Sequence, residues 1–156
     1  MDRSVTAAPS QTPSGIEVTF EVTYEPTSLM ETKLNLLLTS QIGGDYTIPL
    51  HGTCLPPKPQ GPFTIKSNGS TTITFKNVFN VPMQFSFAID NPLFHVSKQS
   101  ELIKPHQAYK LIINFDGNDG PYKAESVMGK LVITAARTAA NASNIQWIYY
   151  LKGNSW

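Results

Sequence analysis

The sequence predicts an all-β protein whose main unit is an antiparallel β-sandwich with Greek-key connections. Three observations lead to this prediction. Short segments of alternating apolar and polar residues recur along the chain, and turn signals such as SNGS, IDNP and AANAS separate them. Hydrophobic residues make up 40% of the chain, and the rest is rich in Thr, Ser, Asn, Pro and Gly, which favour strands and turns. No segment has helical periodicity over a useful length.

Length, charge and cysteine content limit the class of protein. A chain of 156 residues suits one domain, or one and a fraction. Its formal net charge of +1 provides no basic field, so no nucleic-acid partner is expected. The single cysteine, Cys54, excludes an internal disulfide and favours a reducing compartment. No signal-like apolar run follows Met1 and no stretch approaches the roughly 18 apolar residues of a membrane span, so we expect a cytoplasmic protein without membrane insertion.

The first predicted strand follows a polar leader. Residues 1–14 lack apolar periodicity and are expected to be a disordered leader. From Ile16 to Tyr24 apolar residues occupy every second position, which predicts a half-buried strand. The apolar face of this strand consists of Ile16, Val18, Phe20, Val22 and Tyr24.

Two further strands are predicted before the first proline cluster. Thr32–Ser40 and Tyr46–Gly52 both alternate, and the sequence GGD turns the chain between them. The alternating apolar residues are Leu34, Leu36 and Leu38 in the first strand and Tyr46, Ile48 and Leu50 in the second. We expect residues 15–55 to form a partial β module.

A proline-rich linker, residues 56–62, is expected to separate this part from a complete sandwich, residues 63–156. Prolines at the density of PPKPQGP exclude both a helix and a central strand. The predicted strands of the sandwich are Phe63–Lys66, Ser70–Asn77, Gln84–Asp90, Phe94–Ser97, Ala108–Phe115, Gly129–Ala136 and Ile145–Lys152. The segment SELIKPHQ is expected to hold at most a turn of 3₁₀-helix, because Pro105 prevents more.

An internal repeat relates the two parts. Each part ends with a strand, a turn, a strand that begins with Lys-Leu, a loop, and a last strand that closes with Leu-x-Gly. Lys33-Leu34 corresponds to Lys130-Leu131, and Leu50-His51-Gly52 corresponds to Leu151-Lys152-Gly153. The first part therefore matches only the C-terminal half of the complete module. Its apolar stripe lacks an opposite sheet in its own copy and is expected to contact a partner.

A set of core and turn residues in the second part carries a family resemblance. The set consists of Phe75, Asn77, Pro82, Phe85, Phe94, Val96, Pro105, Phe115, Leu131 and Gly153. This pattern is similar to the ASH domain (named for ASPM, SPD-2 and Hydin), a relative of the major sperm protein (MSP) and PapD-like folds. Residues 15–55 resemble half a copy of it. The resemblance implies an immunoglobulin-like β-sandwich.

Tandem copies joined by proline-bearing linkers also resemble hydin-like cilia- and flagella-associated proteins. This resemblance implies a non-catalytic structural or docking module in a scaffold of the ciliary or flagellar axoneme, which serves axoneme assembly and ciliary or sperm flagellar motility. The implied partners are other axonemal or ciliary proteins, reached for example by β-strand addition, or the remainder of a longer parent chain. Because such proteins are long arrays, we expect this chain to be a short isoform or a terminal piece of one.

No residue pattern indicates catalysis, a cofactor or a metal ion. His51, His95 and His106 lack metal-ligand spacing, and Cys54 has no nucleophile signature around it. The sequence DGNDG at residues 116–120 fits a hairpin turn better than a calcium loop, because the later ligands of an EF-hand are missing. We expect no enzymatic activity.

The last strand has two apolar faces. Trp147, Tyr149 and Leu151 alternate on one face, and Ile148 and Tyr150 lie on the other. A strand of this kind is expected to be central in its sheet or covered on its outer side. Ile148 and Tyr150 either contact a partner or belong to an ordinary core. Together with the stripe from Ile16 to Tyr24, they are the candidate partner-contact residues.

Two alternative functions remain open at this point. The first is an MSP-like adaptor that binds short acidic peptide motifs at membrane contact sites through a basic face, which Lys66, Lys76, Lys98, Lys104 and Lys110 would supply. The second is an extracellular adhesion domain glycosylated at Asn68 or Asn141.

Overall fold

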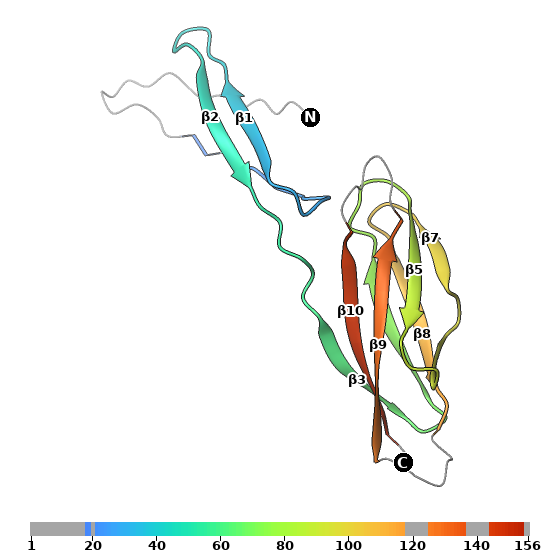
Figure 1. Ribbon diagram of the computed structural model, residues 1–156. Coiled ribbons are helices and arrows are strands. Elements are labelled where there is room, and N and C mark those ends of the chain that lie inside the picture. The colour runs from blue at the N-terminus through green and yellow to red at the C-terminus, as the bar shows by residue number, and fades with distance from the viewer. Residues whose placement is uncertain (1–17, 20, 118–124, 137–143, 155–156) are drawn as a thin grey trace.

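From Gln60 onward the chain forms two β-sheets that pack face to face (Figure 1). The structure is a computed structural model, and it describes residues 18–19, 21–117, 125–136 and 144–154. One sheet has five strands in the order β3-β10-β9-β5-β7, and the other has three in the order β4-β8-β6. Their bounds are β3 (Gln60–Lys66), β4 (Ser70–Lys76), β5 (Met83–Ile89), β6 (Phe94–Val96), β7 (Ser100–Ile103), β8 (Ala108–Phe115), β9 (Ser126–Ala135) and β10 (Gln146–Asn154). The predicted immunoglobulin-like β-sandwich is confirmed.

The first and last strands of the sandwich, β3 and β10, lie side by side in the five-stranded sheet. β10 lies between β3 and β9, so the last strand is central in its sheet, as its two apolar faces predicted. β3 pairs with β10 in parallel, whereas the other strand pairs are antiparallel. The expectation of a wholly antiparallel sandwich was wrong at this edge. A parallel neighbour requires a long crossover, which the strands between β3 and β10 provide.

Alternation along the strands builds the core between the sheets. Leu111, Ile113 and Phe115 of β8 are at most 1% exposed, and the residues between them face outward. Phe75 packs edge-on against Phe85 and Trp147, with ring centroids 4.9 and 5.2 Å apart. Such aromatic pairs add to the free energy gained from burial of their area.

Asn77 is a fully buried polar residue that fastens three segments of the sandwich. Its Nδ2 donates to the carbonyl oxygens of Val81 (3.0 Å), Ile103 (2.9 Å) and Lys104 (3.2 Å). Its Oδ1 accepts a hydrogen bond from the Phe79 backbone N–H at 2.9 Å. The side chain is thus satisfied on both sides, and it joins the end of β4 to the loop before β5 and to the end of β7.

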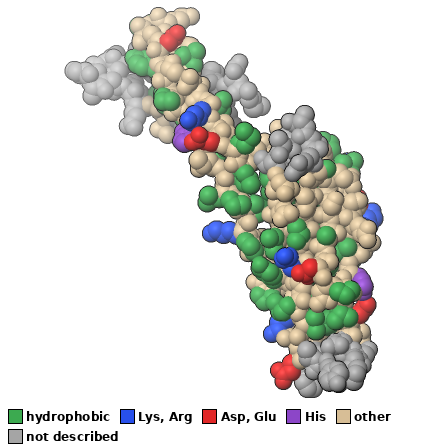
Figure 2. All heavy atoms as spheres, viewed as in Figure 1, with side chains coloured by type: hydrophobic (Ala, Val, Ile, Leu, Met, Phe, Trp, Pro, Cys, Tyr) green, Lys and Arg blue, Asp and Glu red, His purple; other side chains and the backbone are tan. Residues whose placement is uncertain are grey.

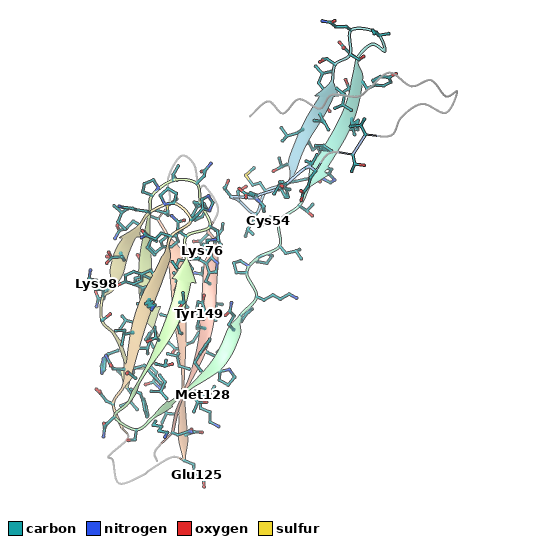
Figure 3. The ribbon with its side chains drawn as sticks, turned by 180° about the vertical axis from the view of Figure 1, so that it is seen from behind. Cys54, Lys76, Lys98, Glu125, Met128 and Tyr149 are labelled. Carbon is teal, nitrogen blue, oxygen red and sulfur yellow. The ribbon has the colours of Figure 1, made fainter. Side chains whose placement is uncertain are left out.

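Before the sandwich, β1 (Thr32–Leu38) and β2 (Tyr46–Gly52) form an isolated antiparallel hairpin (Figure 1). The bounds of β2 agree with the prediction, and those of β1 end two residues earlier than Ser40. Leu29, in the segment before β1, is partly buried and packs against the core of the sandwich. Cys54 lies in the segment that connects the hairpin to the sandwich (Figure 3).

Three expectations about strands were wrong. The described residues from Val18 to Glu25 are not in a strand, because no neighbouring strand pairs with them. Residues Ser100–Ile103 form β7 and not a 3₁₀ turn, because they pair with β5 and Pro105 lies beyond their end. β3 begins at Gln60 and not at Phe63, since Gln60 pairs with Tyr149. Ile16 and residues 1–14 lie outside the described residues.

No helix in the described ranges is long and apolar enough to cross a membrane.

Candidate docking surfaces

The β1–β2 hairpin has one apolar face that is partly uncovered, with three of its six residues exposed and three partly buried. Its register places three cross-strand pairs on this face, Leu34–Leu50, Leu36–Ile48 and Leu38–Tyr46, and we call these six residues the hairpin face. Leu34 is 64% exposed, Tyr46 60% and Ile48 41%. Figure 2 shows hydrophobic side chains on the surface of the hairpin and along the segment that follows it. A surface of this kind is typical of a protein contact.

Tyr24 covers one end of the hairpin face. A Cβ atom on Gly52 would lie 2.5 Å from Cζ of the Tyr24 ring, so the ring fits only because residue 52 is glycine. The Tyr24 hydroxyl donates to Oγ1 of Thr32 at 3.3 Å, and Thr32 is the cross-strand partner of Gly52. The segment before β1 therefore folds over the apolar side of the hairpin at this point.

The opposite face of the hairpin is mixed: it carries charged and polar side chains, but also Pro49 and Leu37, and Leu37 is 57% exposed. Lys33 and His51 are cross-strand partners there, and both approach the carboxylate of Glu31, with the Lys33 Nζ 3.6 Å from Oε2 and the His51 ring against Oε1. All three groups are exposed, so these ion pairs contribute little stability. The hairpin thus has one wholly apolar face and one face on which charged, polar and apolar side chains are mixed.

The outer face of the five-stranded sheet carries a smaller apolar surface. Ile148 is the cross-strand neighbour of Val132, and Tyr150 is that of Lys130. Tyr150 is 40% exposed, whereas Ile148 and Val132 are partly buried. On the inner side of the same strand, Tyr149 points into the sandwich (Figure 3), and burial raises the pKa of its hydroxyl.

The predicted contact residues are thus divided between two places. Val18, Val22 and Tyr24 are exposed and precede the hairpin, while Ile148 and Tyr150 lie on the outer face of the sandwich. Phe20, like Ile16, lies outside the described residues. Their role as partner contacts stays a prediction. The hairpin face was missed as a docking surface, although the alternation in both of its strands was a visible signal.

Two small groups of titratable side chains occur among the described residues: His95 with Asp116, and His51 and Lys33 with Glu31. Nε2 of His95 lies 2.7 Å from Oδ2 of Asp116, and His51 contacts Glu31. His106 is exposed in the turn between β7 and β8. Within the ranges that the structure describes, no group of three or more His, Cys, Asp or Glu residues could hold a metal ion.

The lysines of the adaptor alternative do not share one face. Lys76 and Lys110 lie on the three-stranded sheet, whereas Lys66 belongs to β3 of the five-stranded sheet. Nζ of Lys98 donates to Oε2 of Glu101 at 2.8 Å, and this hydrogen bond together with the charge of Glu101 raises the pKa of Lys98. A basic docking face is therefore not favoured.

Fold and surfaces together define a class: an immunoglobulin-like β-sandwich preceded by a hairpin with a partly open apolar face. No protein-family model matches the chain. The chain is 42% identical over 152 residues to the hydrocephalus-inducing protein of Mus musculus and 40% identical over 152 residues to its Homo sapiens homologue. Both matches cover 97% of this chain and 3% of the relative. The resemblance to hydin-like proteins that the sequence predicted is confirmed.

Among solved structures, the chain is similar to the ASH / PapD-like domain 7 of human CEP192, with a TM-score of 0.47 and 10% identity over 91% of this chain and 96% of that one.

Proposed function

We propose that this chain is a non-catalytic docking module of a cilia-associated scaffold, and that it supports axoneme assembly and ciliary or sperm flagellar motility through protein contacts. The observation that carries the proposal is the 42% identity to the hydrocephalus-inducing protein over 97% of the chain. The matched residues span both the hairpin and the sandwich. The proposed location is the axoneme of the cilium or flagellum.

The surface of the protein supports a role in protein contacts. Exposed apolar residues gather on the hairpin face, and Tyr150 and Met128 add apolar area on the outer side of the sandwich. Among the residues that the structure describes, β1 and β2 pair only with each other, so each has one free edge there. Free edges offer backbone N–H and C=O groups to a further strand, so docking by β-strand addition is the proposed mode.

Localisation of the full chain in ciliated cells tests this proposal. A fluorescently tagged full chain is expected to accumulate along axonemes, whereas a tagged variant with Leu36→Asp on the hairpin face is expected to accumulate less, because it loses apolar contact area. The tag alone is the second control. A uniform cytoplasmic signal for the unaltered chain, equal to that of the tag alone, would contradict the proposal.

A further inference from the structure

The hairpin and the sandwich each contain a close contact between a glycine and an aromatic ring. In the sandwich, a Cβ atom on Gly153 would lie 2.3 Å from Cζ of Phe115. In the hairpin, a Cβ atom on Gly52 would lie 2.5 Å from Cζ of Tyr24. Both glycines lie near the end of the second strand of a hairpin, and both rings come from the segment that precedes that hairpin. The two contacts therefore occupy equivalent positions.

Cross-strand pairing extends this equivalence along both hairpins. Gly52 pairs with Thr32, and Gly153 pairs with Val127. Three pairs of the hairpin face then correspond to three pairs of the sandwich core: Leu34–Leu50 to Gly129–Leu151, Leu36–Ile48 to Leu131–Tyr149, and Leu38–Tyr46 to Ile133–Trp147. The correspondence of Lys33-Leu34 with Lys130-Leu131, predicted from the sequence, was wrong by two residues, because Lys130 pairs with Tyr150 and not with Lys152.

In the sandwich, other strands cover these equivalent positions. β3 pairs in parallel with the edge of β10 that faces away from β9. β5 pairs antiparallel with the edge of β9 that faces away from β10. Phe75 of β4 and Phe94 of β6 pack into the same core from the opposite sheet. All of these strands belong to residues 60–103, and the hairpin has no such neighbours in the part of the chain that the structure describes.

We infer that the hairpin face binds the N-terminal half of a sandwich of the same kind, supplied by a polypeptide segment outside this chain. That segment places one strand parallel to β2 and one antiparallel to β1, and its apolar residues cover the six residues of the hairpin face. The matched section is 3% of the mouse relative, so that protein has ample chain outside the section to supply such a segment.

Leu34 makes this site selective. It occupies the position of Gly129, and a Cβ atom on Gly129 would lie only 2.8 Å from the Phe94 ring. A leucine at that position leaves no room for an aromatic ring like that of Phe94. The bound segment therefore carries a small residue where this chain has Phe94. A second copy of this chain is accordingly a poor match for the site.

A hybrid chain tests the inference directly. Phe115 and Tyr24 are the equivalent rings, and Ala108 lies as far before Phe115 as Glu17 lies before Tyr24. In the hybrid, a second copy of residues 60–107 therefore replaces residues 1–16 and is joined to Glu17. Two versions are made, one with Phe94 of the added half retained and one with Phe94→Ala in the added half. Hydrogen exchange of β1 and β2 amides is compared with that of the full natural chain. Amides of β9 and β10 in the same molecule serve as the control for folding.

The version with Phe94→Ala is expected to slow exchange of β1 and β2 amides by about 100-fold or more, because the hairpin becomes part of a closed sandwich. The version with Phe94 is expected to give less protection, and Leu36→Asp in the hairpin is expected to abolish it. The inference is overturned if both versions leave β1 and β2 exchanging as in the natural chain. It is also overturned if the natural chain alone gains the same protection as its concentration rises, since a second copy would then cover the face. Neither result depends on ciliary location, so this test and the localisation test fail independently.

Discussion

The β1–β2 hairpin and the β9–β10 hairpin have the same local pattern but opposite environments. Leu131 and Leu151 are 0% exposed and Tyr149 is 5% exposed, while at the equivalent hairpin positions Leu36 and Leu50 are only partly buried and Ile48 is 41% exposed. In both hairpins, alternation selects which side chains share a face. Whether that face becomes a core depends on strands that come from elsewhere. Local sequence therefore determines the hairpin, and non-local strands determine its burial.

Matched truncations of equivalent leucines should separate the two hairpins most strongly. Leu131→Ala is expected to lower the free energy of unfolding of the sandwich by about 2–5 kcal/mol, because it leaves a cavity in a closed core. Leu36→Ala, at the equivalent position, is expected to change that free energy by less than about 0.5 kcal/mol, since Leu36 is only partly buried and belongs to a separate two-stranded sheet. Urea denaturation of both variants measures the difference. Equal losses would show that the hairpin is part of the same cooperative core.

Asn77 directly follows β4 of the sandwich, and the described part of the hairpin has no equivalent of that strand. Asn77→Ala is expected to destabilise the sandwich by about 1–3 kcal/mol for each buried polar group left without a partner. Asn77→Asp keeps the acceptor for the Phe79 N–H and loses the donors to the carbonyl groups, so it separates the two contributions. Thermal unfolding measures both variants. A variant that melts as the natural chain does would contradict the role of Asn77 in joining these segments.

The two glycine contacts offer a matched pair of substitutions. Gly153→Ala is expected to cost about 1–3 kcal/mol, because the added methyl group meets the Phe115 ring inside a packed core. Gly52→Ala is expected to displace the Tyr24 ring with little effect on global stability, because that ring is 43% exposed and free to move. Nuclear Overhauser contacts between Tyr24 and Thr32 report the displacement. If both substitutions lowered the melting temperature equally, the two environments would not differ as described.

Alkaline pH should lower the stability of the sandwich through Tyr149, which lies in the β9–β10 hairpin. Burial raises the pKa of this tyrosine above its usual value of about 10, so the neutral form is favoured in the folded state. Its contribution to stability is fully present below pH of about 10 and is lost as the pH rises through the folded-state pKa. Tyr149→Phe is expected to make the decrease in stability above pH 10 shallower. Urea denaturation at several pH values checks this, and an unchanged slope would contradict it.

Sequence patterns predicted the strands with clear alternation but not those that depend on distant partners. Tyr46–Gly52 and Ala108–Phe115 were predicted with the observed bounds because each alternates between clear turns. β7 was missed because its four residues form a strand only by pairing with β5. The strand expected from Ile16 to Tyr24 fails at its described residues for the converse reason, since alternation without a neighbour leaves backbone groups unpaired.

The candidate surfaces were predictable only in part. Tyr150 was identified because β10 has apolar residues on both faces, and the structure places its ring on the outer side of the sandwich. The sequence pattern does not identify the hairpin face as a docking surface, because alternating leucines also suit an ordinary core. The hydrogen bonds of Asn77 could not be predicted from the sequence, since two of its partners, Ile103 and Lys104, lie 26 and 27 residues away.

Hydrogen exchange of the full natural chain, resolved by segment, tests the contrast between the two hairpins most directly. Amides of β9 and β10 are expected to exchange only through global unfolding, because their strands are paired on both sides and their inner face is buried. Amides of β1 and β2 are expected to exchange at least about 100-fold faster, through local opening of an isolated hairpin. Equal protection of the two hairpins would contradict the account, because the hairpin face would then already be covered within this chain.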